Sequence, residues 1–218
     1  MQMTMSQAKL AEYVSRQINS FFPDRDVSSA DLMPYVHSAL ERLEHCLSGI
    51  RDKYLPQNGE TFFSHRHTDH YAMFLYLLAR EAWLKGQNRE IAEKAFGLNK
   101  ALHALDVFFE VELPEIFFFQ HPVGTVLGRA RYSNYFIVYQ RCTVGGKNRV
   151  YPKFSEEVVM FGGSSVIGNC TIGCNVWLSA GALVMSQDVP DNSAVFGQSP
   201  AVVIKPTTRR VRDEFARG

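Results

Sequence analysis

The sequence predicts an α+β chain in which a helical N-terminal part is followed by a coil of short parallel strands. Two observations predict it. In the first ~120 residues apolar side chains recur every three or four positions, which places them on one face of a helix. After Gly145 and Gly146 they recur every six positions, a period that fits neither a helix nor an ordinary hairpin and indicates an internal repeat.

Four helices are expected in the N-terminal part, over about 6–21, 29–50, 69–86 and 89–109. The clearest is 29–50, where Ser29 can cap the start and Pro34 falls near the first turn, where a missing N–H costs little. Thr68 can cap the third helix. Together these segments predict a helical domain over residues 1–118. The apolar face of 29–50 consists of Leu32, Val36, Leu40, Leu43, Leu47 and Ile50.

The second part of the chain repeats every six residues. Its large apolar position is filled by Phe154, Met160, Val166, Ile172, Leu178 and Val184. Four residues after each of the first five come Val158, Ser164, Cys170, Val176 and Ala182, all small or β-branched. Each hexapeptide is expected to form one strand and one turn, with the large side chain inside a narrow coil and the small one at the bend. The coil is predicted over 119–205, with a loop insertion near 146–153 that forms a flexible flap. The tail, 206–218, is expected to be a short solvated helix.

Composition argues against several classes of protein. The formal net charge is +1, which disfavours a broad basic surface for nucleic acid. No apolar run approaches the ~20 residues that span a bilayer, and the N-terminus lacks the apolar core of a secretion signal. The four cysteines include no C-x-x-C pair, so neither a zinc site nor a redox dithiol is indicated. A reduced, cytoplasmic protein is therefore expected.

Three histidines, His65, His67 and His70, stand close together and raise the question of a metal site. His-x-His is a ligand spacing typical of a strand, but this stretch leads into a helix and no cysteine or aspartate set completes it. The start of a capped helix is the expected structure, and no metal is expected.

The stretch HPVGTVLG, His121 to Gly128, lies between the two parts and holds the only histidine of the last 98 residues. An imidazole has a pKa near 6.5 and can remove the proton of a hydroxyl while that hydroxyl attacks a thioester. A histidine before a proline can also be purely structural. The residues alone leave both roles open.

Several segments of the C-terminal ~100 residues resemble motifs of the hexapeptide-repeat acyltransferases, and within them of the serine acetyltransferases. HPVGTVLG is similar to H-G-T-G-[IV]-V-[IV]-G, and IVYQRCTVGG is similar to I-L-Q-x-V-T-L-G-G. The run from PKFSEEVV onward and the closing VPDNSAVFGQSPAVVIKP match further motifs of that family. The resemblance implies a left-handed parallel β-helix, with His121 as general base. It also implies a homotrimer or a dimer of trimers that binds acetyl-CoA between neighbouring coils.

The resemblance further implies a carboxylate that supports His121. In the family an aspartate 15 positions before the histidine has this role. Here Glu112, nine positions before His121 and so one hexapeptide closer, is the first candidate, with Asp106 and Glu115 as substitutes. The alternative is that Glu112 is an exposed residue at a domain junction.

For acetyl-CoA the resemblance implies contacts that are mostly backbone. Gly145 and Gly146 carry no Cβ and allow the chain to approach the thioester and the pantetheine arm. Gly162 and Ala180 match small residues that line the family's groove, and Lys205 stands where a basic residue can meet the nucleotide phosphates.

The acceptor site departs from the family's pattern. Asp69 in HTDHY matches a substrate-contacting aspartate, but Gln120 stands where the family has an aspartate. Val150 and Tyr151 stand where it has arginine and histidine, and Arg149 and Tyr151 are the substrate-side groups expected of the insertion. These losses of charge favour a sugar hydroxyl, in a surface polysaccharide or its precursor, as acceptor.

Two alternatives stay open. One is an L-serine O-acetyltransferase of cysteine biosynthesis, which the match at Asp69 favours. The other is a non-catalytic hexapeptide scaffold that only trimerises and binds a partner.

Overall fold

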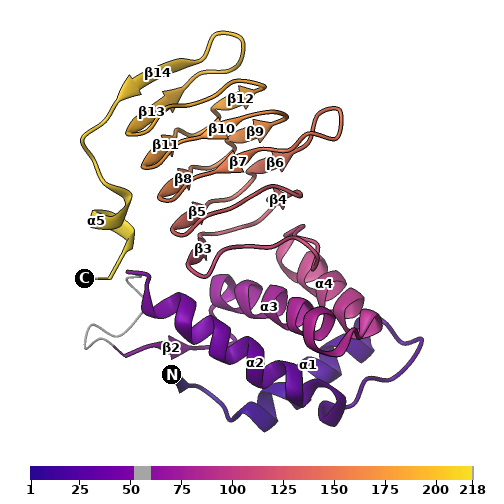
Figure 1. Cartoon of the computed structure of the whole chain (residues 1–218). Helices are drawn as coiled ribbons and strands as arrows, with labels where there is room; N and C mark the ends of the chain where they lie inside the picture. The colour runs from indigo at the N-terminus through magenta and orange to yellow at the C-terminus, as the bar shows by residue number, and fades with distance from the viewer. Residues whose placement is uncertain (52–59, 218) are drawn as a thin grey trace.

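The computed structural model describes residues 1–51 and 60–217, and it shows a layer of helices on which one end of a parallel β-helix stands (Figure 1). The predicted order, helices first and a left-handed parallel β-helix second, is confirmed. A short parallel pair, β1 and β2, ties the N-terminus to the segment before the third helix. The elements of this part are β1 (Gln2–Met3), α1 (Gln7–Phe21), α2 (Ser29–Ser48), β2 (Phe62–Phe63), α3 (Thr68–Gly86) and α4 (Arg89–His103).

Each of these helices begins with a side chain that accepts a backbone N–H. In α2 the cap is Ser28 in a capping box, one residue before the predicted Ser29. In α3 it is His67, whose ring accepts the N–H three residues on, rather than the predicted Thr68. No helix among the described residues is long and apolar enough to cross a membrane.

Helix α4 ends at His103, six residues before the predicted end, because Ala104 takes the left-handed conformation with φ 50°. Two residues later Asp106 already forms a parallel bridge with Val126 of the coil. The chain therefore makes its first backbone contact with the coil at Asp106 and then leaves it again before β3.

The coil has three faces, and each is formed by one sheet whose strands run parallel to one another, apart from β14 (Val203–Pro206). The first sheet contains β3 (Phe117–Phe119), β5 (Phe136–Val138), β8 (Val158–Met160), β11 (Val176–Leu178), β13 (Ser193–Phe196) and the antiparallel β14. The second contains β4 (Val126–Leu127), β6 (Thr143–Gly145), β9 (Ser165–Ile167) and β12 (Leu183–Met185), and the third contains β7 (Lys153–Phe154) and β10 (Thr171–Ile172). We call the bend from first to second sheet the first corner and that from second to third sheet the second corner.

The six-residue repeat works as predicted. Its large apolar residues fall one on each of the strands β7 to β12, and the most exposed of them, Phe154, is 3% exposed. The small residues four positions on are equally buried, with Ser164 and Val176 at 0%. Each hexapeptide therefore supplies two interior side chains, a large one and a small one; Ser164, Cys170 and Ala182 precede a strand, whereas Val158 and Val176 are the first residues of one.

The insertion near 146–153 is a tight hairpin. Thr143 pairs with Ser165, 22 residues on, whereas Ser165 pairs with Leu183, 18 residues on, so this coil is four residues longer than the next. Lys147 and Val150 exchange both backbone hydrogen bonds at 3.0 Å. The two residues between them have φ of 53° and 63°, as in a type I′ turn. The flexible flap expected from the sequence is thus an ordered two-residue turn.

The tail forms a short helix whose polar side chains are mostly exposed, as predicted, but it is docked on the coil, which the sequence did not predict. From β14 it runs back along the first sheet to the helices, with α5 (Val211–Phe215) lying against the coil (Figure 1). Val211 is fully buried, and the tail ends in a bridge between Ala216 and Ile50. The reason lies on the sheet's outer face, where Val159 and Trp177 are apolar and need cover.

Candidate functional site

His121 lies at the first corner, between β3 and β4. Its φ is 51°, a left-handed conformation that other non-glycine residues at the turns of this coil also adopt. Its side chain is 61% exposed, so the imidazole faces outward from the corner and not into the packed coil.

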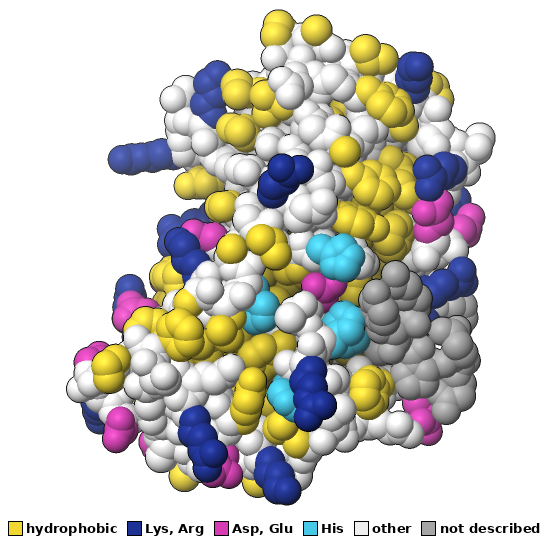
Figure 2. Space-filling model, turned by 180° about the vertical axis from the view of Figure 1, so that it is seen from behind, with side chains coloured by type: hydrophobic (Ala, Val, Ile, Leu, Met, Phe, Trp, Pro, Cys, Tyr) yellow, Lys and Arg dark blue, Asp and Glu magenta, His cyan; other side chains and the backbone are white. Residues whose placement is uncertain are grey.

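A buried carboxylate contacts this histidine. Asp69, in the first turn of α3, is 4% exposed. Its Oδ2 accepts the backbone N–H of His121 at 3.1 Å and lies 3.5 Å from the Nδ1 atom of the ring. On this face of the molecule, histidine side chains gather around an acidic side chain where the helical layer meets the coil (Figure 2). The helical domain therefore supplies the acid and the coil supplies the imidazole.

Two further polar side chains, His103 and Asn99, lie on the neighbouring helix α4. The ring of His103 is buried, and burial lowers its pKa while the charge of Asp69 acts in the opposite direction. His103 Nδ1 lies 2.8 Å from Asn99 Oδ1, and the Asn99 amide donates to the Ala72 carbonyl at 2.9 Å. These contacts order the helix faces that surround the acid.

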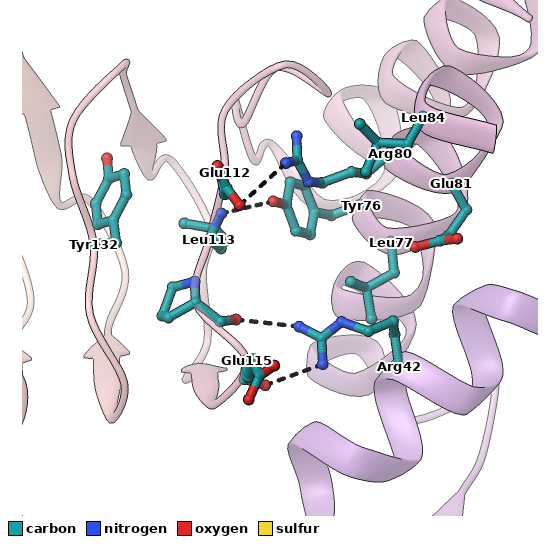
Figure 3. A pocket seen from close by; sticks show the side chains of 11 residues that line it. Arg42, Tyr76, Leu77, Arg80, Glu81, Leu84, Glu112, Leu113, Glu115 and Tyr132 are labelled. Carbon is teal, nitrogen blue, oxygen red and sulfur yellow. Dashed lines mark hydrogen bonds and ion pairs between the residues drawn. The ribbon is translucent and has the colours of Figure 1, made fainter. Parts of the chain in front are cut away.

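The structure does not bring Glu112 to His121. The Glu112 carboxylate is 82% exposed and lies 3.7 Å from Arg80 Nη2. It borders a cavity of about 320 Å³ in which Arg42 donates to the carbonyls of Pro114 and Glu115 (Figure 3). The physical reason is that residues 107–116 cross the helices outside the coil, so counting by hexapeptides does not apply to them.

The two substitutes named for Glu112 have other partners as well. Asp106, which does stand 15 positions before His121, accepts a hydrogen bond from Lys100 at 2.6 Å. The carboxylate of Glu115 lies 3.6 Å from the ring of His45. Among the described residues, Asp69 is thus the carboxylate that contacts His121.

Above His121 the first corner forms a column along the axis of the coil. The strand registers place Gln140 one turn on, then Gly162, then Ala180. A Cβ atom on Gly162 would lie 2.7 Å from Gln140 Nε2, so only glycine leaves the Gln140 amide where it is. Gly162 and Ala180, both predicted for acetyl-CoA, thus share a line with His121.

The other residues predicted for acetyl-CoA lie elsewhere on the same chain. Gly145 and Gly146 stand at the second corner, where a Cβ on Gly146 would meet the Tyr151 ring at 2.7 Å. Arg149 stands at the tip of the hairpin that projects from this corner. Lys205 is on β14 at the far end of the coil, with its ammonium 5.8 Å from the Phe196 ring. Within one chain these groups stand at the second corner and the far end of the coil, away from the first corner.

A cavity of about 370 Å³ opens beside His121. Gln120, predicted to be on the substrate side, lines it, with its amide nitrogen 3.2 Å from His121 Nε2. The sequence gives no signal for most of the other lining residues, because they reach the cavity only through the docking of the helices and the tail. The lining consists of Arg51, Phe118, Gln120, His121, Tyr139, Glu214 and Phe215. In the described part of the chain no cluster of three ligating side chains is placed to hold a metal ion.

No family model matches the chain. Among curated proteins it is similar to a serine acetyltransferase of Synechococcus elongatus, with 29% identity over 133 residues. That match covers 58% of this chain and 54% of the cyanobacterial enzyme, so it spans about half of that relative's length. A serine acetyltransferase of Staphylococcus xylosus is 26% identical over 150 residues, which cover 66% of this chain and 68% of the relative.

Solved structures give the same fold. Serine acetyltransferase from Brucella abortus superimposes with a TM-score of 0.72 at 19% identity, over 93% of this chain and 84% of that one. The same enzyme in complex with coenzyme A superimposes with a TM-score of 0.70 at 18% identity, over 95% of this chain and 84% of that one. The soybean serine acetyltransferase complexed with serine superimposes with a TM-score of 0.70 at 18% identity, over 93% of this chain and 85% of that one. The resemblance predicted from the motifs is confirmed: the chain is serine acetyltransferase-like in sequence and in fold.

Proposed function

We propose that this protein is an acetyl-CoA-dependent O-acetyltransferase that acetylates the hydroxyl of L-serine, with His121 as general base. One observation carries the proposal: a carboxylate that is 4% exposed, Asp69, contacts both the backbone and the ring of an outward-facing histidine. A base oriented by a second group is the arrangement that activates a hydroxyl nucleophile.

The chemistry follows from this pair. His121 takes the proton of the acceptor hydroxyl while its oxygen forms a bond to the thioester carbonyl carbon. The resulting tetrahedral intermediate breaks its carbon–sulfur bond, and the imidazolium returns the proton to the departing thiolate of CoA. Asp69 stabilises the imidazolium between these two steps and fixes the backbone at position 121.

The column at the first corner suits the donor. Gly162 and Ala180 present almost no side chain there, and the Gln140 amide lies directly over Gly162. An extended pantetheine arm that runs along this column brings its thioester down to His121. The Brucella relative is known with coenzyme A bound, which supports a CoA ester as donor.

The comparisons favour L-serine over the sugar acceptor predicted from the sequence. The curated relatives are serine acetyltransferases, and the soybean enzyme is known as a complex with serine. A buried carboxylate beside the base also suits an acceptor that carries an ammonium group, since a charge removed from water needs a partner.

The active unit is proposed to be a homotrimer. Arg149 and Tyr151 project from the second corner, whereas His121 occupies the first, so one chain does not bring them to a single site. A neighbouring copy that turns its second corner toward the first corner of this chain completes a groove between them. The groove then also receives Gly145 and Gly146.

The test is the release of CoA thiol from acetyl-CoA with L-serine, beside a panel of sugars and oligosaccharides. We expect saturable turnover of L-serine. His121→Asn is expected to keep acetyl-CoA binding and to lower kcat at least ~100-fold, the lower range for loss of an acid–base group. Turnover of sugars but not of L-serine would support the sugar acceptor that the sequence favours. No turnover of any acceptor would favour the non-catalytic scaffold.

A further inference from the structure

The cavity beside His121 has a wall that comes from the end of the chain. Glu214 and Phe215, near the end of the chain, line it together with Gln120 and His121, and Arg51 lines it from the segment that follows α2. The two charged residues, Arg51 and Glu214, lie 163 positions apart in the sequence. Their meeting at one cavity is a consequence of the docked tail.

The tail is held firmly enough to fix Glu214 in place. Arg210 and Arg212 both contact the carboxylate of Glu157, whose side chain is 8% exposed, and the Arg212 Nε atom lies 2.9 Å from it. On the other side of Glu214 the carbonyl of Phe215 accepts the backbone N–H of Arg51 at 2.7 Å. Glu214 is therefore anchored on both sides and brought next to Arg51.

The charge of Arg51 has a neutral partner, whereas that of Glu214 is shared with Arg209 through one of its two oxygens. Arg51 Nη1 donates to the backbone carbonyl of Asp213 at 3.0 Å, a neutral partner that leaves the guanidinium charge available. Both contacts from Arg209 to Glu214 go to Oε1, so Oε2 can accept from a ligand. Tyr139, which also lines the cavity, has its pKa raised by burial and, in addition, by the nearby charge of Glu214.

We propose that Arg51 and Glu214 determine the acceptor class: Arg51 binds a carboxylate, and Glu214, together with Asp69, binds an ammonium group. The acceptor is then a zwitterionic hydroxy amino acid. In the sequence these two charges are missing at Gln120 and Val150–Tyr151, and the segment after α2 and the docked tail supply Arg51 and Glu214 from other positions. This inference rests on the proposed function, because it assumes that the cavity beside His121 takes the acceptor.

A neutral acceptor would use this cavity poorly. A sugar offers hydroxyl groups but no negative charge to compensate Arg51, and a charged group that loses water without gaining a partner weakens binding. A ligand with one carboxylate and one ammonium compensates both signs at once.

The experiment measures KM and kcat by CoA release with three acceptors. L-serine has both charges, 3-hydroxypropionate lacks the ammonium group and ethanolamine lacks the carboxylate. Glu214→Gln is expected to raise the KM for L-serine about 10- to 100-fold and to change that for 3-hydroxypropionate by less than about twofold. Arg51→Gln is expected to act likewise on L-serine and to leave ethanolamine unchanged.

The control is Asp213→Asn, which removes the adjacent tail carboxylate but leaves intact the backbone carbonyl that holds Arg51. It is expected to match the wild type, and the KM for acetyl-CoA is expected to stay constant in all variants. Thermal melting checks that each variant folds.

The outcomes separate this inference from the proposed function. If the wild type saturates with L-serine but both variants keep its KM, the acceptor assignment is overturned and the proposed function stands. Equal losses with all three acceptors would show that the tail only shapes the cavity, which also overturns the assignment. Failure of the wild type to acetylate L-serine overturns the proposed function itself.

Discussion

Asp69→Asn tests the central pair of the site. Asparagine has the same shape and keeps an oxygen for the His121 backbone N–H, which Asp69 accepts at 3.1 Å. What it removes is the negative charge 3.5 Å from Nδ1 of the ring. The substitution therefore separates the electrostatic role of the carboxylate from its role in holding the corner.

The expected magnitude follows from the contact that is lost. The contact that is lost becomes an ion pair when the imidazole is protonated, and we expect it then to contribute about 1.5–3 kcal/mol, as an interaction with a charged partner does. Each 1.4 kcal/mol corresponds to about a factor of ten in rate. Because the charge of the imidazolium develops only during the reaction, kcat is expected to fall about 10- to 150-fold. The KM for L-serine is expected to rise in addition, because Asp69 is also proposed to bind its ammonium group. The melting temperature is expected to change little, since an amide of equal size replaces a buried charge.

The assay is CoA release at saturating acetyl-CoA over a series of L-serine concentrations. Glu112→Gln is the matched control: it removes the carboxylate that the sequence points to, which the structure pairs with Arg80. The control is expected to keep the wild-type kcat. A normal kcat in Asp69→Asn together with a large loss in Glu112→Gln would refute the reasoning.

Two further substitutions test the groove and the tail. Gly162→Ala places a Cβ 2.7 Å from Gln140 Nε2 and so pushes that flexible amide into the column. The KM for acetyl-CoA should then rise about tenfold or more, with little change in melting temperature. An unchanged KM would show that the donor binds elsewhere. Glu157→Gln removes the negative charge shared by two tail arginines, so trypsin should cleave the tail faster and the KM for L-serine should rise. Glu156→Gln removes only an exposed contact with Arg212 and should have a much smaller effect in both assays.

The coil was predictable because its information is local. Each hexapeptide carries its own interior residue, such as Met160 or Val166, and its own small residue at the bend, such as Ser164. A period of six in the sequence therefore maps directly onto a turn of the coil. The insertion was predicted less well. The sequence shows its extra residues, but it does not show that Asn148 and Arg149 take the left-handed conformation of a tight turn.

The site was less predictable because it joins segments that are far apart. Asp69 was expected to contact the substrate, but its contact with His121 depends on how α3 docks on the end of the coil. Glu112 was assigned by counting back from His121 in steps of the repeat, and that count fails where the chain leaves the coil after Asp106. The docking of the tail on Glu157 had no local signal at all.

These long-range contacts explain why the sequence favoured an uncharged acceptor. The comparison with the family's motifs counts charges position by position, and at Gln120 and Tyr151 it finds none. A binding site, however, is selected for the charges that reach the ligand and not for the positions from which they come. The tail and the helical domain bring Glu214 and Arg51 to the same cavity as His121. The chain has therefore lost two charges from the motif while Arg51 and Glu214 line the cavity with one charge of each sign, which supports the proposed acceptor with both signs over a neutral sugar.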